Sequence, residues 1–211
     1  MNNEVALIHT TVDGDKLIAY MARVSNPANQ SNPDNSKLIN YLIKHQHWSP
    51  FEMVNMCVEI WTTRSISTQI LRHRSFSFQE FSTRYSSPCT LSYPIEPQLR
   101  KQDLTNRQNS TDDLSEEDKE RFGFAVRHSL QSAYTLYEEM IQAGIAKECA
   151  REVLPLAIPT KLYMNGTLRS WIHYVNLRTH KDTQLEHRDI ALKIKKLIEL
   201  NYPLVYKAAF T

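Results

Sequence analysis

The first 73 residues alternate between two hydrophobic periods, which predict strands and amphipathic helices in turn. Every second residue is apolar at Val5 and Leu7 and again over residues 54–60, and this period of two indicates strands with one buried face. Elsewhere apolar residues recur every three or four positions, as in helices with one apolar side. The helices predicted in this way cover residues 17–24, with a cap at Asp15, 36–43 and 65–73.

A long helix is predicted after Ser115. Ser115 is followed by three acidic residues, which is the form of a helix cap with an acidic first turn, and Gly144 is placed to end the helix. The residues expected on its buried side are Phe122, Ala125, Leu130, Ala133, Leu136, Tyr137 and Met140.

The last third of the chain repeats both periods. A short helix over 147–154, a strand around Leu162 and Met164, and a helix over 167–178 are predicted in that order. A final helix, capped by Asp182 or Thr183, is expected to end before Pro203. Many helices around few strands, segregated rather than alternating, predict an α+β fold.

Residues 94–119 interrupt these patterns. The segment is rich in Pro, Gln, Asn, Asp and Ser, and it begins within the sequence Tyr93-Pro94-Ile95-Glu96-Pro97, which neither a helix nor a central strand accommodates. We therefore expect a long flexible loop inside a single domain that spans residues 1–211.

Composition narrows the class of protein. With 25 basic and 23 acidic side chains the net charge is +2, so any phosphate recognition must be local rather than spread over a basic surface. The three cysteines form no CxxC pair, which fits a reducing compartment, and none has the cationic neighbours that activate a thiolate nucleophile. No apolar run reaches the roughly 18–20 residues that span a bilayer. A soluble intracellular protein is therefore expected. The sequence contains neither GxGxxG nor GxxxxGK, which excludes the usual glycine-rich loops that bind phosphate groups.

Residues 72–84 combine three arginines and a histidine with three phenylalanines. One interpretation is a solvated helix end followed by a core strand with its phenylalanines inward. The other is an anion site with a stacking wall, and the use of Arg rather than a mixture of Lys and Glu favours it. A helix up to residue 73 would turn Gln69, Arg72 and His73 to one side. An extended chain beyond it would place Glu80, Ser82 and Arg84 on one face.

Three other groups of residues can be interpreted either as structural or as functional. His45 and His47 with Glu52 suggest a metal, but His-x-His in a turn without a third nearby ligand is more typical of packing, and no metal site is predicted. Arg151 suits either a surface cap or a ligand. Arg169 and His173 share a helical face, which is either solvated or the wall of a nucleotide pocket.

The sequence Arg72-His73-Arg74, seven residues, then Ser82-Thr83-Arg84 resembles the RHRx7SxR signature of the flavin-dependent thymidylate synthases. Further similarity to that family runs in order through residues 22–25, 47–52, Gln69, Arg151 and 168–178. Met53 and His173 depart from the family pattern, which often has His and Asn at these positions.

This resemblance implies the family fold, with helices around a small, mostly antiparallel sheet. It also implies the methylation of dUMP to dTMP, with 5,10-methylenetetrahydrofolate as carbon donor, FAD as hydride carrier and NADPH as reductant. The family uses no cysteine nucleophile and forms homotetramers with shared sites. We expect a methyltransferase in the cytoplasm, or in the host cytoplasm if the gene is viral.

The resemblance also assigns roles to residues of this chain. Arg178 would polarise the uracil as the catalytic residue, and His47 would lie near the flavin ring and the folate. The residues implied to bind FAD are Ser25, Ser49, Arg72, His73, Arg74, Glu80, Thr167, Leu168, Arg169 and His173. Those implied to bind dUMP are Gln69, Ile70, Leu71, Arg72, Glu80, Phe81, Ser82, Thr83, Arg84, Arg151 and Arg178.

Two other functions remain as alternatives. Arg with interleaved Phe also suits a platform for single-stranded nucleic acid, although the near-neutral net charge argues against that partner. A metal-dependent nucleotide hydrolase would have to use His45, His47, Glu52 and His73, which do not form a convincing ligand set.

Overall fold

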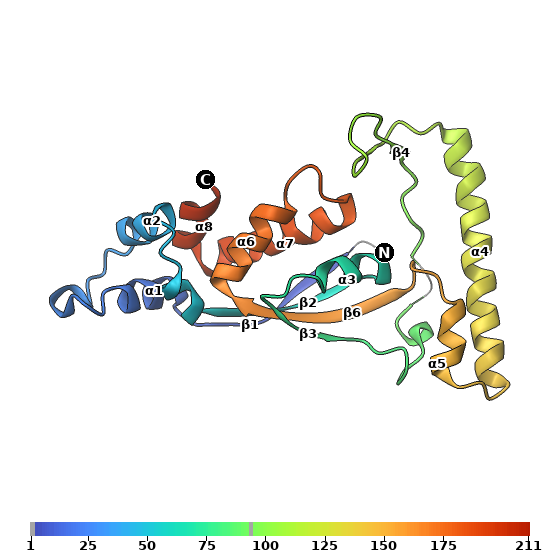
Figure 1. Ribbon diagram of the computed structural model, residues 1–211, viewed down its shortest axis with the longest axis horizontal. Helices are drawn as coiled ribbons and strands as arrows, with labels where there is room; N and C mark the ends of the chain where they lie inside the picture. The colour runs from blue at the N-terminus through green and yellow to red at the C-terminus, as the bar shows by residue number, and fades with distance from the viewer. Residues whose placement is uncertain (1–2, 93–94) are drawn as a thin grey trace.

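The computed structural model describes residues 3–92 and 95–211, and it has an antiparallel sheet along the middle of an elongated molecule (Figure 1). The sheet has four strands in the order β1-β2-β6-β3. They are β1 (Glu4–Thr10), β2 (Asn55–Thr63), β6 (Pro159–Thr167) and β3 (Ser77–Glu80), and each neighbouring pair is antiparallel. The predicted α+β class and antiparallel sheet are confirmed.

The alternation in β2 and β6 sorts their side chains onto two different faces. Met56, Val58 and Leu162 belong to the face that is fully buried in the core. The other face stays partly exposed and is polar and aromatic: Lys161 lies 3.5 Å from Glu59 and 5.0 Å from the centre of the Trp61 ring. In Figure 1 one face of the sheet is covered by helices, and that face carries the core.

The helices fall into three groups. Those over the sheet are α3 (Arg64–Ile70), α6 (Leu168–Arg178) and α7 (Leu185–Asn201). Those at one end are α1 (Gly14–Ala22), α2 (Ser36–Lys44) and α8 (Pro203–Phe210), and those at the other end are α4 (Glu116–Gln142) and α5 (Lys147–Ala150). Short 3-10 turns are η1 (Pro27–Asn29), η2 (Ser49–Met53), η3 (Pro88–Thr90) and η4 (Arg151–Val153). No helix of the described residues is long and apolar enough to cross a membrane.

The C-terminal end of the chain corrects the predicted final helix and two predicted helix caps. Helix α7 ends at Asn201, before Pro203 as predicted, but it is not the final helix. Pro203 begins α8, because proline fits the first turn of a helix, where its missing N–H has no partner to lose. Asp15 does not cap its own helix: its carboxylate accepts from the backbone N–H groups of Leu204 at 2.9 Å and Val205 at 3.3 Å. Helix α7 begins after Gln184, without the predicted side-chain cap.

The stretch that follows α3 is less regular than predicted. Helix α3 ends at Ile70, so Arg72 and His73 lie in the turn beyond it and do not share a helical face with Gln69. Strand β3 ends at Glu80, and the backbone then turns, with the N–H groups of Tyr85 and Ser86 donating to the Ser82 carbonyl. The predicted extended face of Glu80, Ser82 and Arg84 is therefore wrong.

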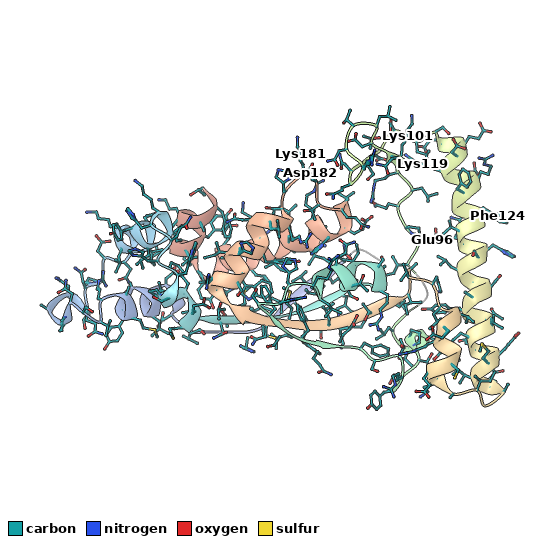
Figure 2. All side chains as sticks on the ribbon, viewed as in Figure 1. Glu96, Lys101, Lys119, Phe124, Lys181 and Asp182 are labelled. Atoms are coloured by element: carbon teal, nitrogen blue, oxygen red, sulfur yellow. The ribbon has the colours of Figure 1, made fainter. Side chains whose placement is uncertain are left out.

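The predicted loop contains a small hairpin of β4 (Lys101–Gln102) and β5 (Ser110–Thr111), and it ends where α4 begins. Its first residue, Pro94, lies outside the described residues. Asn106 in the hairpin donates to Asp182 at 2.8 Å, which ties it to the connection between α6 and α7. Figure 2 shows Lys181 and Asp182 at this connection, beside the hairpin. Flexibility of the segment stays a prediction.

Helix α4 stands apart from the sheet and packs mainly against α5 and η4 (Figure 1). Ser115 caps it as predicted, accepting from the Asp118 N–H at 3.1 Å. Leu130, Tyr134 and Tyr137 are the buried residues of α4. Phe122, Phe124, Ala125 and Leu136 are exposed, and Figure 2 shows Phe124 at the outer edge of the molecule. The prediction that Phe122, Ala125 and Leu136 are buried is wrong for the single chain, because only one side of α4 meets the body.

Candidate active site

Arg178 and His73 form a direct contact, although 105 positions separate them in the sequence. Arg178 is the last residue of α6, and its Nε donates a hydrogen bond to Nε2 of His73 at 2.9 Å. Burial, with a smaller contribution from the Arg178 charge, lowers the pKa of His73 to about 4. A neutral His73 can accept at Nε2, so this bond orients the guanidinium without neutralising its charge.

A pocket of about 480 Å³ opens beside this pair. Gln69, Arg72 and Arg178 all line it, and Gln108 of the hairpin forms part of its wall. Within the described residues, the Arg72 guanidinium makes no ion pair with a carboxylate. The pocket is of nucleotide size, and its lining contains two guanidinium groups and the side-chain amides of Gln69, Gln108 and Gln184, together with the Asp182 carboxylate. The N–H donors of the guanidinium and amide groups suit a ligand with several oxygen acceptors.

The hydrogen-bond partners of Gln69 include a histidine that sequence reasoning did not select. His187 of α7 is fully buried, with Nδ1 3.3 Å from Oε1 of Gln69 and Nε2 3.0 Å from the hydroxyl of Tyr174. Its position offered a signal, because His187, Ile190 and Ile194 follow the buried stripe of α7. A histidine on such a stripe needs polar partners from other elements.

Acid should destabilise the protein through His187. Burial, and then the charges of Arg178 and His73, lower the pKa of His187 to about 3, against about 6.5 in an unfolded chain. The unfolded state therefore binds more protons between these two pKa values, and stability falls as the pH drops below about 6.5. We expect His187 to account for a loss of about 2 kcal/mol in the free energy of unfolding between pH 7 and pH 5.

Urea titrations at several pH values measure this effect, with His187→Asn as the comparison. The variant should be less stable at pH 7 and should lose less stability on acidification than the wild type. Parallel losses in the two proteins would assign the acid sensitivity to other groups.

At the start of α6 a second cluster holds Arg169. Glu52 of η2 accepts from Arg169 Nη1 at 2.5 Å and from the Thr167 hydroxyl at 2.9 Å, and the Arg169 contact is the main reason that the pKa of Glu52 is lowered. His173 lies one turn after Arg169, on the shared face that the sequence predicts, and both residues are exposed. Leu168 is fully buried, so only its backbone can meet a ligand.

Other residues predicted to lie near the flavin are on η2 and in the loops that precede it. Ser49 is exposed at the first position of η2, and η2 packs against α6 and α1. His47 is exposed just before it, with its ring 5.8 Å from that of Tyr41. Ser25 is exposed in the turn after α1.

The carboxylate of Glu80 is bound by other side chains of the protein. Its carboxylate pairs with Arg64 at 2.6 Å and accepts from the hydroxyls of Ser67 at 2.6 Å and Thr160 at 3.0 Å. These contacts fix the end of β3 against α3 and β6. Ile70 and Thr83 are likewise buried, which leaves their backbones rather than their side chains for ligand contacts.

Two predicted dUMP residues, Arg84 and Arg151, lie in a different place. Arg84 lines a separate pocket of about 320 Å³ with Lys147 and Glu148, and its guanidinium is 3.6 Å from the Glu148 carboxylate. Arg151 follows α5 closely and lies 3.5 Å from Glu152. No described lining residue is common to this pocket and the Arg178 pocket, so one chain does not bring the two groups together.

Comparison with known proteins decides the family. Residues 6–204 match the family described as thymidylate synthase complementing protein. A flavin-dependent thymidylate synthase from Synechocystis is 50% identical over 205 residues, which are 97% of this chain and 94% of the relative. The chain belongs to the flavin-dependent thymidylate synthase family. It is accordingly an enzyme, a methyltransferase.

A further relative and a solved structure extend the match. A flavin-dependent thymidylate synthase from Thermus thermophilus is 34% identical over 195 residues, covering 92% of this chain and 71% of the relative. The crystal structure of a UMP/dUMP methylase from Streptomyces cacaoi bound with 5-Br dUMP superposes with a TM-score of 0.85 at 25% identity, covering 98% of this chain and 94% of that one. The predicted fold is thereby confirmed as that of the family.

The two departures from the family pattern sit at the surface. Met53 is 58% exposed at the end of η2, and His173 is exposed on α6, so neither residue supports the core. Among the described residues, no group of three or more His, Cys, Asp and Glu side chains is arranged to hold a metal ion.

Proposed function

We propose that this flavin-dependent thymidylate synthase converts dUMP to dTMP with the Arg178 pocket as its dUMP site. The carbon donor would be 5,10-methylenetetrahydrofolate and the reductant NADPH. The observation that carries the proposal is that Gln69, Arg72 and Arg178, all predicted dUMP residues, line one pocket, with His73 bonded to Arg178 beside it.

The chemistry of the pocket suits a pyrimidine nucleotide. Arg72 can hold a phosphate with paired N–H donors. Arg178, oriented by neutral His73, can place its remaining N–H groups on a uracil carbonyl oxygen and stabilise negative charge that develops on the ring. Such stabilisation needs no cysteine, and Cys57, Cys89 and Cys149 line neither this pocket nor the Arg84 pocket.

The residues predicted to hold FAD fit that cofactor in their donor chemistry. Arg74 and Arg169 are exposed guanidinium groups, and Arg74 makes no ion pair with a carboxylate of the described residues. Arg74 can therefore bind a pyrophosphate without breaking an internal contact. Arg169 would have to bind the pyrophosphate while it also keeps its ion pair with Glu52. When bound, FAD would supply the hydride that the methylation requires.

A homotetramer with shared sites would complete this arrangement. Ser82, Arg84 and Arg151 belong to the predicted dUMP set but lie apart from the Arg178 pocket, and a neighbouring subunit can supply them. The exposed apolar side chains of α4 offer a surface for such contacts, since large exposed hydrophobic patches favour association. We place the enzyme in the cytoplasm, or in the host cytoplasm if its gene is viral.

A spectroscopic titration tests the proposed function. The purified protein should be yellow, dUMP should perturb the flavin absorbance, and NADPH should bleach it. Replacing both Arg72 and Arg74 by Ala should lower the ratio of flavin to protein, whereas Arg121→Ala, at an exposed arginine on α4, should not. A colourless protein that is indifferent to added FAD would contradict the proposal.

A further inference from the structure

A continuous chain of hydrogen bonds runs from the surface into the core behind the Arg178 pocket. Gln184 Nε2 donates to the Glu186 carboxylate at 3.0 Å, and Gln69 Nε2 donates to Oε1 of Gln184 at 2.7 Å. Oε1 of Gln69 lies 3.3 Å from Nδ1 of His187, and Nε2 of His187 lies 3.0 Å from the Tyr174 hydroxyl. All five side chains are therefore connected in series.

The carboxylate at one end fixes the direction of every bond in the series. A carboxylate only accepts, so Gln184 must turn its NH2 group to Glu186 and its carbonyl oxygen to Gln69. Gln69 must then present its NH2 group to Gln184 and its carbonyl oxygen to His187. Nδ1 of His187 consequently carries the proton, and Nε2 accepts from the Tyr174 hydroxyl.

The surroundings hold each group in the form that this direction requires. Arg100 lies 2.8 Å from the Glu186 carboxylate and keeps an acceptor there. Burial holds His187 neutral, with one N–H and one acceptor nitrogen, and it raises the pKa of the Tyr174 hydroxyl, which remains a donor. The two bonds of Gln184 are exposed, so the cost of reversal falls on the part-buried contact between Gln69 and His187 and on the buried contact between His187 and Tyr174, where a polar atom facing a like atom is unfavourable.

We propose that His187 and Tyr174 are positioning residues for substrate binding, which act by locking the side-chain amide of Gln69. The lock keeps the Gln69 carbonyl oxygen on the buried side, so that the second N–H of its Nε2 faces the pocket. That N–H donates to an oxygen acceptor of the nucleotide, a phosphate or carbonyl oxygen. This inference rests on the proposed assignment of the Arg178 pocket to dUMP.

Two substitutions of His187 separate positioning from structural support. His187→Asn puts an amide nitrogen near the place of Nδ1 and can still donate to Gln69. His187→Gln reaches the place of Nε2 instead, so it keeps the Tyr174 contact and loses the one to Gln69. Each variant loses one buried hydrogen bond, and we expect similar losses of thermal stability.

Calorimetric titration of FAD-loaded enzyme with dUMP should nevertheless distinguish the two variants. His187→Gln should bind dUMP about fivefold more weakly than the wild type, and His187→Asn within about twofold. Gln69→Ala should weaken binding about tenfold. Adding His187→Gln to Gln69→Ala should cause no further loss, because the group to be positioned is gone. Tyr174→Phe, which retains the ring, should follow the same rule with a loss of about twofold.

Tyr202→Phe is the matched control, since it removes another buried tyrosine hydroxyl, one that donates to the Asn55 carbonyl away from the pocket. It should lower stability and leave dUMP affinity unchanged. Equal affinities for His187→Asn and His187→Gln, additive losses in the Gln69→Ala background, or normal binding by Gln69→Ala would each overturn the positioning role. A wild-type enzyme that fails to bind dUMP would instead refute the proposed function.

Discussion

Arg178→Ala should reduce thymidylate formation by about 100-fold or more while the protein keeps its bound FAD. The Arg178 guanidinium lines the pocket and is held by a neutral histidine, so its charge is available to the uracil ring. Its loss removes stabilisation that is needed when negative charge develops on the ring. The measurement is tritium release from dUMP labelled on the uracil ring, together with the ratio of flavin to protein.

Two further variants make the Arg178 result specific. Arg178→Lys keeps the charge but loses the planar fork and the Nε–H that meets His73, so it should recover only part of the activity. Arg121→Ala removes an exposed arginine on α4, whose ion pair with Asp118 is 3.2 Å long, and it should release tritium normally. Near-normal release by Arg178→Ala would refute the polarising role.

Hydrophobic period was sufficient to predict the central elements of the fold. Apolar residues alternate along strands β2 and β6 and recur every three or four positions along helix α6. In each element these apolar residues are buried in the structure, because their burial stabilises the element. The missed helix α8 and the remote cap on it from Asp15 depend on contacts between residues about 190 positions apart. A local pattern carries no information on such contacts.

The site could be predicted only in part, for the same reason. The signature stretch pointed to Arg72 and His73, and its resemblance to a family pointed to Arg178, but the contact between them is a product of the fold. The phenylalanines of that stretch could have been ligand contacts or core residues. Phe76 packs against the core. Its ring packs 4.6 Å from that of Trp171, and a side chain at Gly166 would collide with it.

Electrostatic partners were the hardest feature to predict. Glu80 was expected to face ligands, yet Arg64 and two hydroxyls satisfy its carboxylate inside the protein. His187 was not selected at all, because a histidine among apolar residues shows its function only when its partners on α3 and α6 are known.

Two inactive variants should restore activity to one another when they are expressed together. Arg178→Ala damages one pocket and Arg84→Ala the other, and the two pockets have no described residue in common. If each dUMP site combines Arg178 of one subunit with Arg84 of another, a mixed oligomer contains some sites in which both residues are intact. Random assembly from equal amounts of the two chains would leave roughly a quarter of the sites intact.

Different affinity tags on the two chains allow mixed oligomers to be isolated, and tritium release from them should far exceed that of either variant alone. The matched control pairs Arg178→Ala with Arg72→Ala, because both residues line the same pocket. If Arg72 and Arg178 of a site come from one subunit, every site in that mixture lacks one of these two arginines. Activity should therefore stay low. Recovery in the control, or none in the Arg84 mixture, would mean that the sites are not divided between subunits in this way.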